Sequence, residues 1–218
     1  MDAAALFRTA CQARQNQDIE SAIGAIDDAQ RLAPDDPQIA AVRALLYYES
    51  WRPSSDLFAH ALALNPEDMQ LRRNQALALV SEGERDAAEA LLERELQRQP
   101  DWSEGHSTLS RIRLTAGDAA NYDRSFADAC ARQDGSFSLH LAWFHQAALI
   151  KDWDKVRSIL AKAELRYPGQ SALRSARFYL AAESGDEAGA EAAYGEVANL
   201  ADPGLDLCKV RYHLRKGD

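Results

Sequence analysis

The sequence predicts an all-α fold, a solenoid of about six helix-turn-helix repeats followed by one further helix. Three observations lead to this prediction: prolines recur at intervals close to 34 residues, turn residues recur every 34 residues, and large apolar residues keep the same spacing. A repeated unit of this size buries its apolar face against its neighbours, so the pattern indicates a stacked array.

Two series of helix-breaking residues mark the turns. The first series consists of Pro34, Pro66, Pro100, Pro168 and Pro203. Asp134 and Gly135 occupy the one position of this series that lacks a proline. The second series has a spacing of 34 and consists of Gly83, Gly117, Lys151 and Gly185, each followed by an acidic residue. Glycine closes a helix in left-handed backbone, and an acidic residue after it caps the next helix. Lys151 lacks this backbone freedom, so we expect it to be a poorer closing residue.

The third series lies in the second helix of each repeat. Its members are Ile26, Phe58, Leu92, Phe126, Leu160 and Tyr194, spaced 34 residues apart except for one interval of 32. Most flanking residues four positions before and three after are small. Offsets of three and four share one face of a helix, so a large side chain between small ones lets a neighbouring helix approach closely. The short interval predicts a tightened turn at Trp51, Arg52 and Pro53.

The three series together give the boundaries of a single domain, residues 1–218. The predicted repeats are residues 3–34, 35–66, 67–100, 101–134, 135–168 and 169–202. Between the turns lie segments of about 12 to 15 residues with helical periodicity, so each repeat is predicted to be two antiparallel helices.

The stretch 205–216 is predicted to be a lone terminal helix. One apolar stripe of this helix is predicted to pack on the sixth repeat and consists of Leu207, Val210 and Leu214. A second set would leave the outer side partly apolar and consists of Leu205, Cys208 and Tyr212. Because the ends of a solenoid should be polar, this pattern indicates either missing chain or self-association through the C-terminal helix.

Composition excludes several classes of partner. The 218 residues carry 25 basic and 34 acidic side chains, a net charge of −9 with a pI near 5.1. Nucleic-acid binding needs a concentrated basic face, so neither nucleic acid nor an anionic membrane surface is an expected partner. No apolar run approaches the roughly 20 residues of a membrane span, and the amino terminus lacks a secretory signal. A cytoplasmic protein is therefore expected.

Chemistry-bearing motifs are absent from the sequence, so we expect no enzyme, no cofactor and no metal site. His140 and His145 would lie some 140° apart on a helix and could not chelate one ion together. The three cysteines, Cys11, Cys130 and Cys208, are far apart and are predicted to be reduced packing residues. Core packing is likewise the expected role of Trp51, Trp102, Trp143 and Trp153.

A 34-residue helix-turn-helix with a small-large-small pattern in its second helix and proline at its end resembles the tetratricopeptide repeat. The resemblance covers nearly the whole chain. It departs from the family at Phe144 and Phe178, where the first helix usually has a small residue. Pentatricopeptide repeats, which read RNA, are basic, and HEAT and armadillo repeats are longer, so neither fits. The resemblance implies a right-handed superhelix whose first helices line a concave groove.

In the family, partners are extended peptides or helices gripped by first-helix side chains that recur once per repeat. Leu77, Arg111, His145 and Tyr179 lie at one such position, and Ser107 lies beside it. The residues expected to bind a partner in the concave groove are Arg73, Asn74, Arg111, His145, Tyr179 and Lys209. Arginine and tyrosine would suit a partner with carboxylate and aromatic groups.

The expected function is a non-catalytic protein–protein interaction scaffold that binds a peptide or protein segment. The alternative is the N-terminal region of a larger enzyme, such as an oxygenase or sulfotransferase, in which the repeats serve substrate recruitment or oligomerisation. Reading the gene beyond Asp218 tests this alternative.

Overall fold

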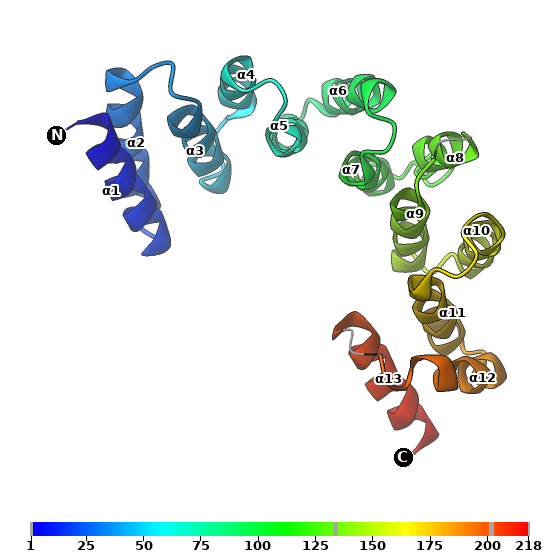
Figure 1. Cartoon of the computed structure of the whole chain (residues 1–218). Helices are drawn as coiled ribbons and strands as arrows, with labels where there is room; N and C mark the ends of the chain where they lie inside the picture. Colours follow the sequence, from blue (N-terminus) through cyan, green and yellow to red (C-terminus); the bar gives the residue numbers. More distant parts are fainter. Residues whose placement is uncertain (1, 133–134, 201–202, 218) are drawn as a thin grey trace. The chain divides into compact units, whose positions relative to one another are not determined.

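The computed structural model describes residues 2–132, 135–200 and 203–217, whose regular structure is entirely helical (Figure 1). The described residues form thirteen α-helices and no strand. In chain order they are α1 (Ala3–Gln15), α2 (Ile19–Leu32), α3 (Pro37–Glu49), α4 (Ser55–Leu64), α5 (Met69–Ser81), α6 (Arg85–Arg98), α7 (Ser103–Thr115), α8 (Arg124–Ala131), α9 (Phe137–Leu149), α10 (Trp153–Arg166), α11 (Ser171–Ser184), α12 (Glu187–Val197) and α13 (Pro203–Lys216). The all-α prediction is confirmed.

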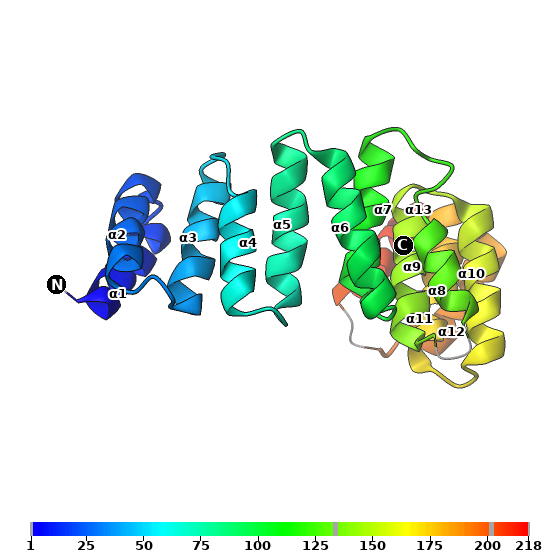
Figure 2. The ribbon, with the colours of Figure 1, turned by 90° about the horizontal axis from the view of Figure 1, so that it is seen from above.

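The helices follow one another as packed pairs, and each pair falls within one predicted repeat. Figure 2 shows α3, α4, α5 and α6 side by side, running alternately up and down. Two predicted repeat ends, residues 134 and 202, lie outside the described residues. The last helix begins at Pro203, slightly before the predicted residue 205. The solenoid of helix pairs that the sequence predicts is thus the observed architecture.

The chain consists of two compact units, which are described separately. Unit 1 comprises Met1–Gln99 and Arg111–Gly117, and unit 2 comprises Pro100–Ser110 and Asp118–Asp218. The division runs through α7, between Ser110 and Arg111.

The small-large-small pattern of the second helices forms the core in both units. Five of the six large side chains are buried, and Tyr194 is half-buried. The positions four residues before are all buried and are occupied by Ala22, Ser54, Ala88, Tyr122, Val156 and Ala190. Those three residues after are also buried and are Ala29, Ala61, Glu95, Ala129, Ala163 and Val197. The packing role predicted for this series is therefore confirmed.

The turn between the two helices of a repeat uses one left-handed residue at the same place every time. Gly83, Gly117 and Gly185 have φ angles of 86°, 83° and 84°, as the glycine series predicts. Lys151 has the same conformation with φ 58°, and so do Gln17 and Trp51 with φ 62° and 60°. Gln17 and Trp51 lie outside the predicted series: they are 34 residues apart, but Trp51 precedes Gly83 by only 32. Three repeats therefore carry a strained non-glycine residue at this position.

We expect Lys151→Gly to stabilise the chain, because glycine adopts left-handed backbone without the steric cost that a Cβ imposes. The cost removed is about 1 kcal/mol, of which the larger conformational entropy of glycine in the unfolded chain offsets a part. Urea denaturation followed by circular dichroism measures the change. Lys151→Ala is the matched control, since alanine keeps the Cβ. A glycine variant no more stable than the alanine variant would contradict the strain argument.

The tryptophans divide between core and surface. Trp143 is buried, and its Nε1 donates a hydrogen bond to Asp123 Oδ2 at 2.9 Å. Trp153 is half-buried and packs against the hydrophobic cluster that contains Trp143. Trp102 lies against Gly105, where a Cβ would collide with the indole ring. The core-packing prediction is wrong for Trp51, which is 89% exposed. Its left-handed position at the tip of a turn directs the side chain to solvent.

The second helix of the fourth repeat, α8, begins late. Its equivalents α6 and α10 start at Arg85 and Trp153, whereas α8 starts only at Arg124. Tyr122 occupies the position where most repeats have a small residue, and it is buried there. Alanine at this position allows the neighbouring helix to pack closely, and the larger tyrosine ring does not. The first turn of the helix is therefore replaced by a looser turn. The backbone N–H and side-chain amide of Asn121 donate to the Asp118 carboxylate in that turn.

The helix that follows the shortened interval, α4, is capped by a neighbouring repeat. The Ser54 side chain makes no capping hydrogen bond. Instead Glu82, at the end of α5, accepts hydrogen bonds from the backbone N–H groups of Ser54 and Ser55 at 2.7 and 2.9 Å. Burial raises the pKa of Glu82, but the hydrogen bonds from Ser55 and Ser54 outweigh it and hold the pKa below its usual value. The first turn of α4 thus depends on a residue of the next repeat.

The C-terminal helix packs through the opposite side from the one predicted. The residues predicted to face the sixth repeat are exposed: Leu207, Val210 and Leu214. The set predicted to lie outward is buried against α11 and α12: Leu205, Cys208 and Tyr212. These three residues lie 32 positions after Leu173, Ala176 and Leu180, which face the preceding helix α10 in the same way. The last interval is therefore shortened by two residues, and a strict spacing of 34 selects the wrong face.

Candidate functional site

The residues at one position per repeat on the first helices of unit 1 form a partly exposed apolar strip. Cys11, Leu45 and Leu77 occupy the same register position on α1, α3 and α5, and all three are half-buried. Phe7 and Val42, which lie one turn earlier on α1 and α3, are half-buried too. We call these five residues the unit 1 strip. Their side chains pack between the helices and leave part of their apolar surface exposed.

Two predicted site residues, Arg73 and Asn74, lie on α5 beside this strip. Both are half-buried, and the Asn74 Oδ1 accepts a hydrogen bond from Gln70 Nε2 at 3.1 Å. They lie four and three residues before Leu77, on the same face of the helix. A guanidinium and a carboxamide are thus placed at the edge of an apolar surface.

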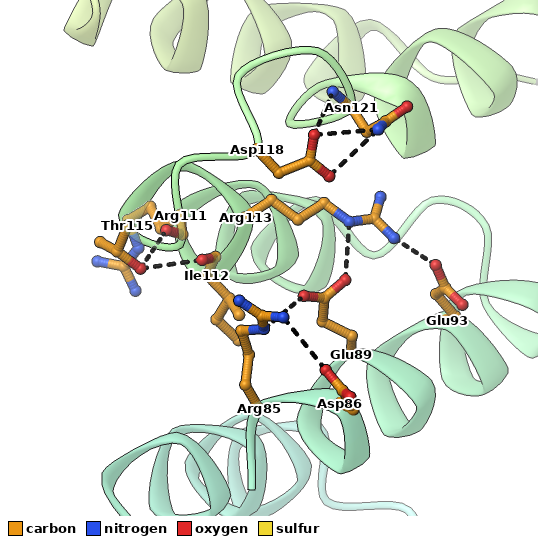
Figure 3. A network of polar contacts seen from close by, with 10 residues as sticks. All are labelled: Arg85, Asp86, Glu89, Glu93, Arg111, Ile112, Arg113, Thr115, Asp118 and Asn121. Atoms are coloured by element: carbon orange, nitrogen blue, oxygen red, sulfur yellow. Dashed lines mark hydrogen bonds and ion pairs between the residues drawn. The ribbon is translucent and has the colours of Figure 1, made fainter. Parts of the chain in front are cut away.

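The predicted residue Arg111 is exposed on the part of α7 that belongs to unit 1. Figure 3 shows it on the opposite side of α7 from Arg113. Arg113 is buried, and its Nε donates to Glu89 Oε2 at 3.0 Å while its terminal nitrogen pairs with Glu93. Arg113 therefore joins α7 to α6, and Arg111 faces solvent.

In unit 2, His145 of α9 and Tyr179 of α11 both contact the ring of Phe144. The Phe144 ring meets His145 and Tyr179 edge-on, with centroid distances of 5.5 and 6.1 Å. His145 is exposed and Tyr179 is half-buried. Burial raises the pKa of Tyr179, and the nearby Glu183 charge raises it further, so the phenol stays protonated and can donate a hydrogen bond. The position that recurs once per repeat on the first helices thus brings these two residues to the same aromatic ring.

Lys209 is buried on α13, and its ammonium is occupied within the chain. It donates to the carbonyl oxygens of Ala198 and Leu200 at 3.3 and 2.7 Å, and it pairs with Asp206 at 3.4 Å. A positive charge at the C-terminal end of α12 suits the carbonyls there. A partner would reach Lys209 only by displacing these bonds.

Sequence reasoning missed the apolar members of the unit 1 strip. The same spacing that selects Leu77, Arg111 and His145 also leads back to Leu45 and Cys11, when the 32-residue interval is used. The predicted partner-binding residues are polar or aromatic, and the apolar members of this series, Cys11, Leu45 and Leu77, lie outside that prediction.

Two open cavities of about 360 and 410 Å³ lie in unit 2, among α10, α11 and α12. They share Arg177 and Glu196. Arg177 bridges the two second helices, since it pairs with Glu164 of α10 at 2.7 Å and with Glu196 of α12 at 3.3 Å. None of the predicted site residues lines either cavity.

The described residues hold no group of three histidine, cysteine, aspartate or glutamate side chains that could bind a metal ion. His140 is buried, with its Nδ1 3.1 Å from the Ser136 carbonyl, while His145 is exposed, so the two imidazoles lie apart as the helix geometry predicts. Within the described part of the chain, no helix has the length and apolar character needed to cross a bilayer.

Comparison with solved structures finds tetratricopeptide repeat proteins. One from Parabacteroides merdae has a TM-score of 0.56 and 15% identity, and the match covers 99% of this chain and 87% of that one. PilF of Pseudomonas aeruginosa gives 0.51 and 16%, over 99% and 96% of the two chains. Yeast Tom70 gives 0.55 and 14%, over 89% of this chain and 44% of its own.

No protein-family model matches the sequence, and no curated protein matches it significantly. At identities of 14–16%, the structural likenesses establish a shared fold and nothing finer.

Proposed function

We propose that this chain, which has the tetratricopeptide repeat fold, is a non-catalytic scaffold that binds a segment of another protein along its first helices. This fold is generally a protein–protein interaction module. The observation that carries the proposal is the unit 1 strip, where partly exposed apolar side chains recur once per repeat beside Arg73 and Asn74.

The chemistry of the strip favours an extended or helical segment with apolar anchors and an acidic group. Apolar anchors would complete the burial of side chains that the fold leaves half-exposed. Arg73 would pair with a carboxylate, for which the planar guanidinium is suited. Asn74 offers both a donor and an acceptor, which suits the peptide backbone of a bound segment.

In unit 1, Arg111 extends the same proposal with a second guanidinium on a first helix. In unit 2, His145 and Tyr179 are proposed as a separate contact, which offers an imidazole and an amphipathic phenol ring to a carboxylate or aromatic group of a partner. Lys209 remains in the proposed set only for a partner that displaces its internal bonds.

Affinity capture from native cell extract tests this function. The chain is compared with a triple variant on the first helices, Arg73→Glu/Arg111→Glu/His145→Ala. The matched control makes the same changes on second helices, as Arg31→Glu/Arg124→Glu/His60→Ala, where all three residues are exposed. Proteins captured specifically are expected to bind the first variant at least about tenfold more weakly and the control unchanged.

Circular dichroism melting curves of both variants test whether the fold is intact. Equal loss in the two variants, or no loss in either, would contradict binding along the first helices. Catalysis is not part of the proposal, because the sequence lacks the motifs of phosphate-binding loops, nucleophile elbows and metal-ligand pairs. The cytoplasmic location belongs to the proposal as well and is tested by cell fractionation.

A further inference from the structure

The start of α8 is weakly held. This helix has only 8 residues, and its N-cap residue Asp123 makes no side-chain capping hydrogen bond. The Asp123 carboxylate is bound instead by Trp143 Nε1 and, at 3.0 Å, by the Lys155 ammonium. At the other end of α8, Arg166 of α10 donates to the Cys130 carbonyl oxygen at 2.9 Å. A short helix with an uncapped first turn opens at a lower cost than a long helix with a capped one.

The repeat that contains α8 also holds most of the unpaired buried polar atoms of the described chain. Six buried side-chain nitrogen or oxygen atoms of the described residues have no hydrogen-bond partner, and four of them belong to the fourth repeat. These four atoms are His106 Nδ1, Ser110 Oγ, Tyr122 OH and Ser125 Oγ. A buried polar atom without a partner loses its bonds to water on folding and regains them when the segment opens. The polar groups of this repeat therefore make opening of α8 easier.

His106 of α7 lies against α8. Its imidazole is 2% exposed and stacks on the Phe126 ring, with centroids 5.1 Å apart. Its Nε2 lies 2.8 Å from the Pro100 carbonyl oxygen, which can only accept, so Nε2 carries the proton and Nδ1 is bare in the neutral ring. A proton on Nδ1 would be a buried donor with no acceptor among the described residues. Burial lowers the pKa of His106, against opposing effects of the Pro100 carbonyl and the Asp101 charge.

The charged groups around His106 do not compensate for its burial. Asp101, in the turn before α7, favours the protonated ring, but it is exposed, so water screens its charge. From α8, the Asp123 carboxylate is already paired with Lys155. α9 packs on α8 and contributes a second buried histidine, His140. The other charged side chains of α8 and of the unit 2 part of α7 are exposed: Glu104, Arg124 and Asp128.

We propose that protonation of His106 opens α8 and so makes the fourth repeat sensitive to acid. In the open state the imidazole is solvated and binds a proton with the ordinary pKa of about 6.5. The closed state resists the proton, because the ring is buried against Phe126. The closed state is therefore fully stable above about pH 6.5 and loses stability as the pH falls below that value, where the open state binds more protons. This proposal is independent of partner binding on the first helices.

Hydrogen exchange followed by mass spectrometry tests the opening of α8 directly. The protection factors of peptides from α8 and α10 are compared after correction for the intrinsic exchange rate at each pH. In the parent chain, the protection of α8 relative to α10 is expected to fall about tenfold between about pH 7.5 and 5.5, the change that uptake of one proton by the open state produces. Constant relative protection of α8 across this range would overturn the proposal.

His106→Gln removes the titration but keeps an N–H that can donate to the Pro100 carbonyl. The protection of α8 in this variant is expected to stay constant across the same pH range. His140→Gln is the matched control, because His140 is also buried and lies at the equivalent position of α9, 34 residues later, with its ring against Tyr167. This control should show the same fall as the parent chain. A fall that persists in His106→Gln, or that disappears in His140→Gln, contradicts the assignment to His106.

Proton NMR titration of the parent chain covers the case in which His106→Gln does not fold. The His106 ring is expected to stay neutral to a lower pH than the ring of the exposed His60 of α4. Its protonation is expected to coincide with the loss of the α8 amide signals. Titration of His106 together with His60, with the α8 signals unchanged, would show that the closed state accepts the proton and would overturn the proposal.

Discussion

Replacing Phe126 by alanine is expected to lower the free energy of unfolding by about 4 kcal/mol, the range measured for phenylalanine truncation in well-packed cores. Phe126 is fully buried in the hydrophobic cluster that also contains Trp143 and Phe144, and it stacks on His106 with ring centroids 5.1 Å apart. Truncation leaves a cavity among side chains from several helices that cannot collapse together. Ala129, on the same face of α8, is too small to move into this cavity.

Urea denaturation monitored by circular dichroism measures this effect. Leu165→Ala is the control, because Leu165 is 87% exposed on α10 and its truncation should change stability by less than about 0.5 kcal/mol. If Phe126→Ala cost no more than this control, the large residue would not be the packing centre of its repeat.

The second large effect is expected at Arg72, whose replacement by methionine should destabilise the chain by about 3 kcal/mol. Arg72 of α5 pairs with Glu95 of α6 at 3.2 Å, and their side chains are 13% and 3% exposed. Glu95 stands where other repeats have alanine or valine, so its carboxylate lies inside the packing face. Removing Arg72 leaves that carboxylate buried, and its other ion-pair partners among the described residues are the exposed Arg94 and Arg98.

The double variant Arg72→Met/Glu95→Ala separates this explanation from a simple loss of contact. With the charge removed as well, stability should recover by about 2 kcal/mol relative to Arg72→Met, since the residue that replaces Glu95 is the one other repeats use. Thermal melting of both variants provides the comparison. A double variant less stable than Arg72→Met would show that Glu95 contributes favourably without its partner.

The elements that repeat six times could be predicted from the sequence, because each occurrence supports the others. The packing series around Ile26 and Leu92, and the glycine turns at Gly83 and Gly185, follow from spacing alone and are confirmed. Helix starts can be predicted where a capping residue is present: the side chains of Asp36 and Asp152 accept hydrogen bonds from backbone N–H groups in the first turns of α3 and α10. Local chemistry and repeat spacing agree at these positions.

Positions where the interval changes could not be predicted. The face that α13 buries depends on a two-residue shortening, and both of its faces are apolar, so hydrophobicity could not choose between Leu205 and Leu207. The core-packing prediction fails at Trp51 because this ring occupies the left-handed position of a turn. Its place in the left-handed turn series is visible only when Gln17 is recognised as another member.

The candidate site was predicted in part. His145 and Tyr179 do lie together around Phe144, since the constant spacing in that half of the chain keeps the helix phase. Lys209 was selected by sequence position alone, and nothing in the sequence indicated that its ammonium would hold the carbonyls that end α12. Internal bonding of long polar side chains is a tertiary effect that no local pattern encodes.

The carboxylate of Glu82 has a consequence for how repeats of this protein can be rearranged. Because it completes the start of α4 from the following repeat, the second and third repeats are not interchangeable modules. Deleting the third repeat leaves two N–H groups of α4 without the acceptor that Glu82 provides, and deleting the second leaves the Glu82 carboxylate without these two donors. Protein engineers who shorten or extend this array should therefore cut at other junctions and move these two repeats together.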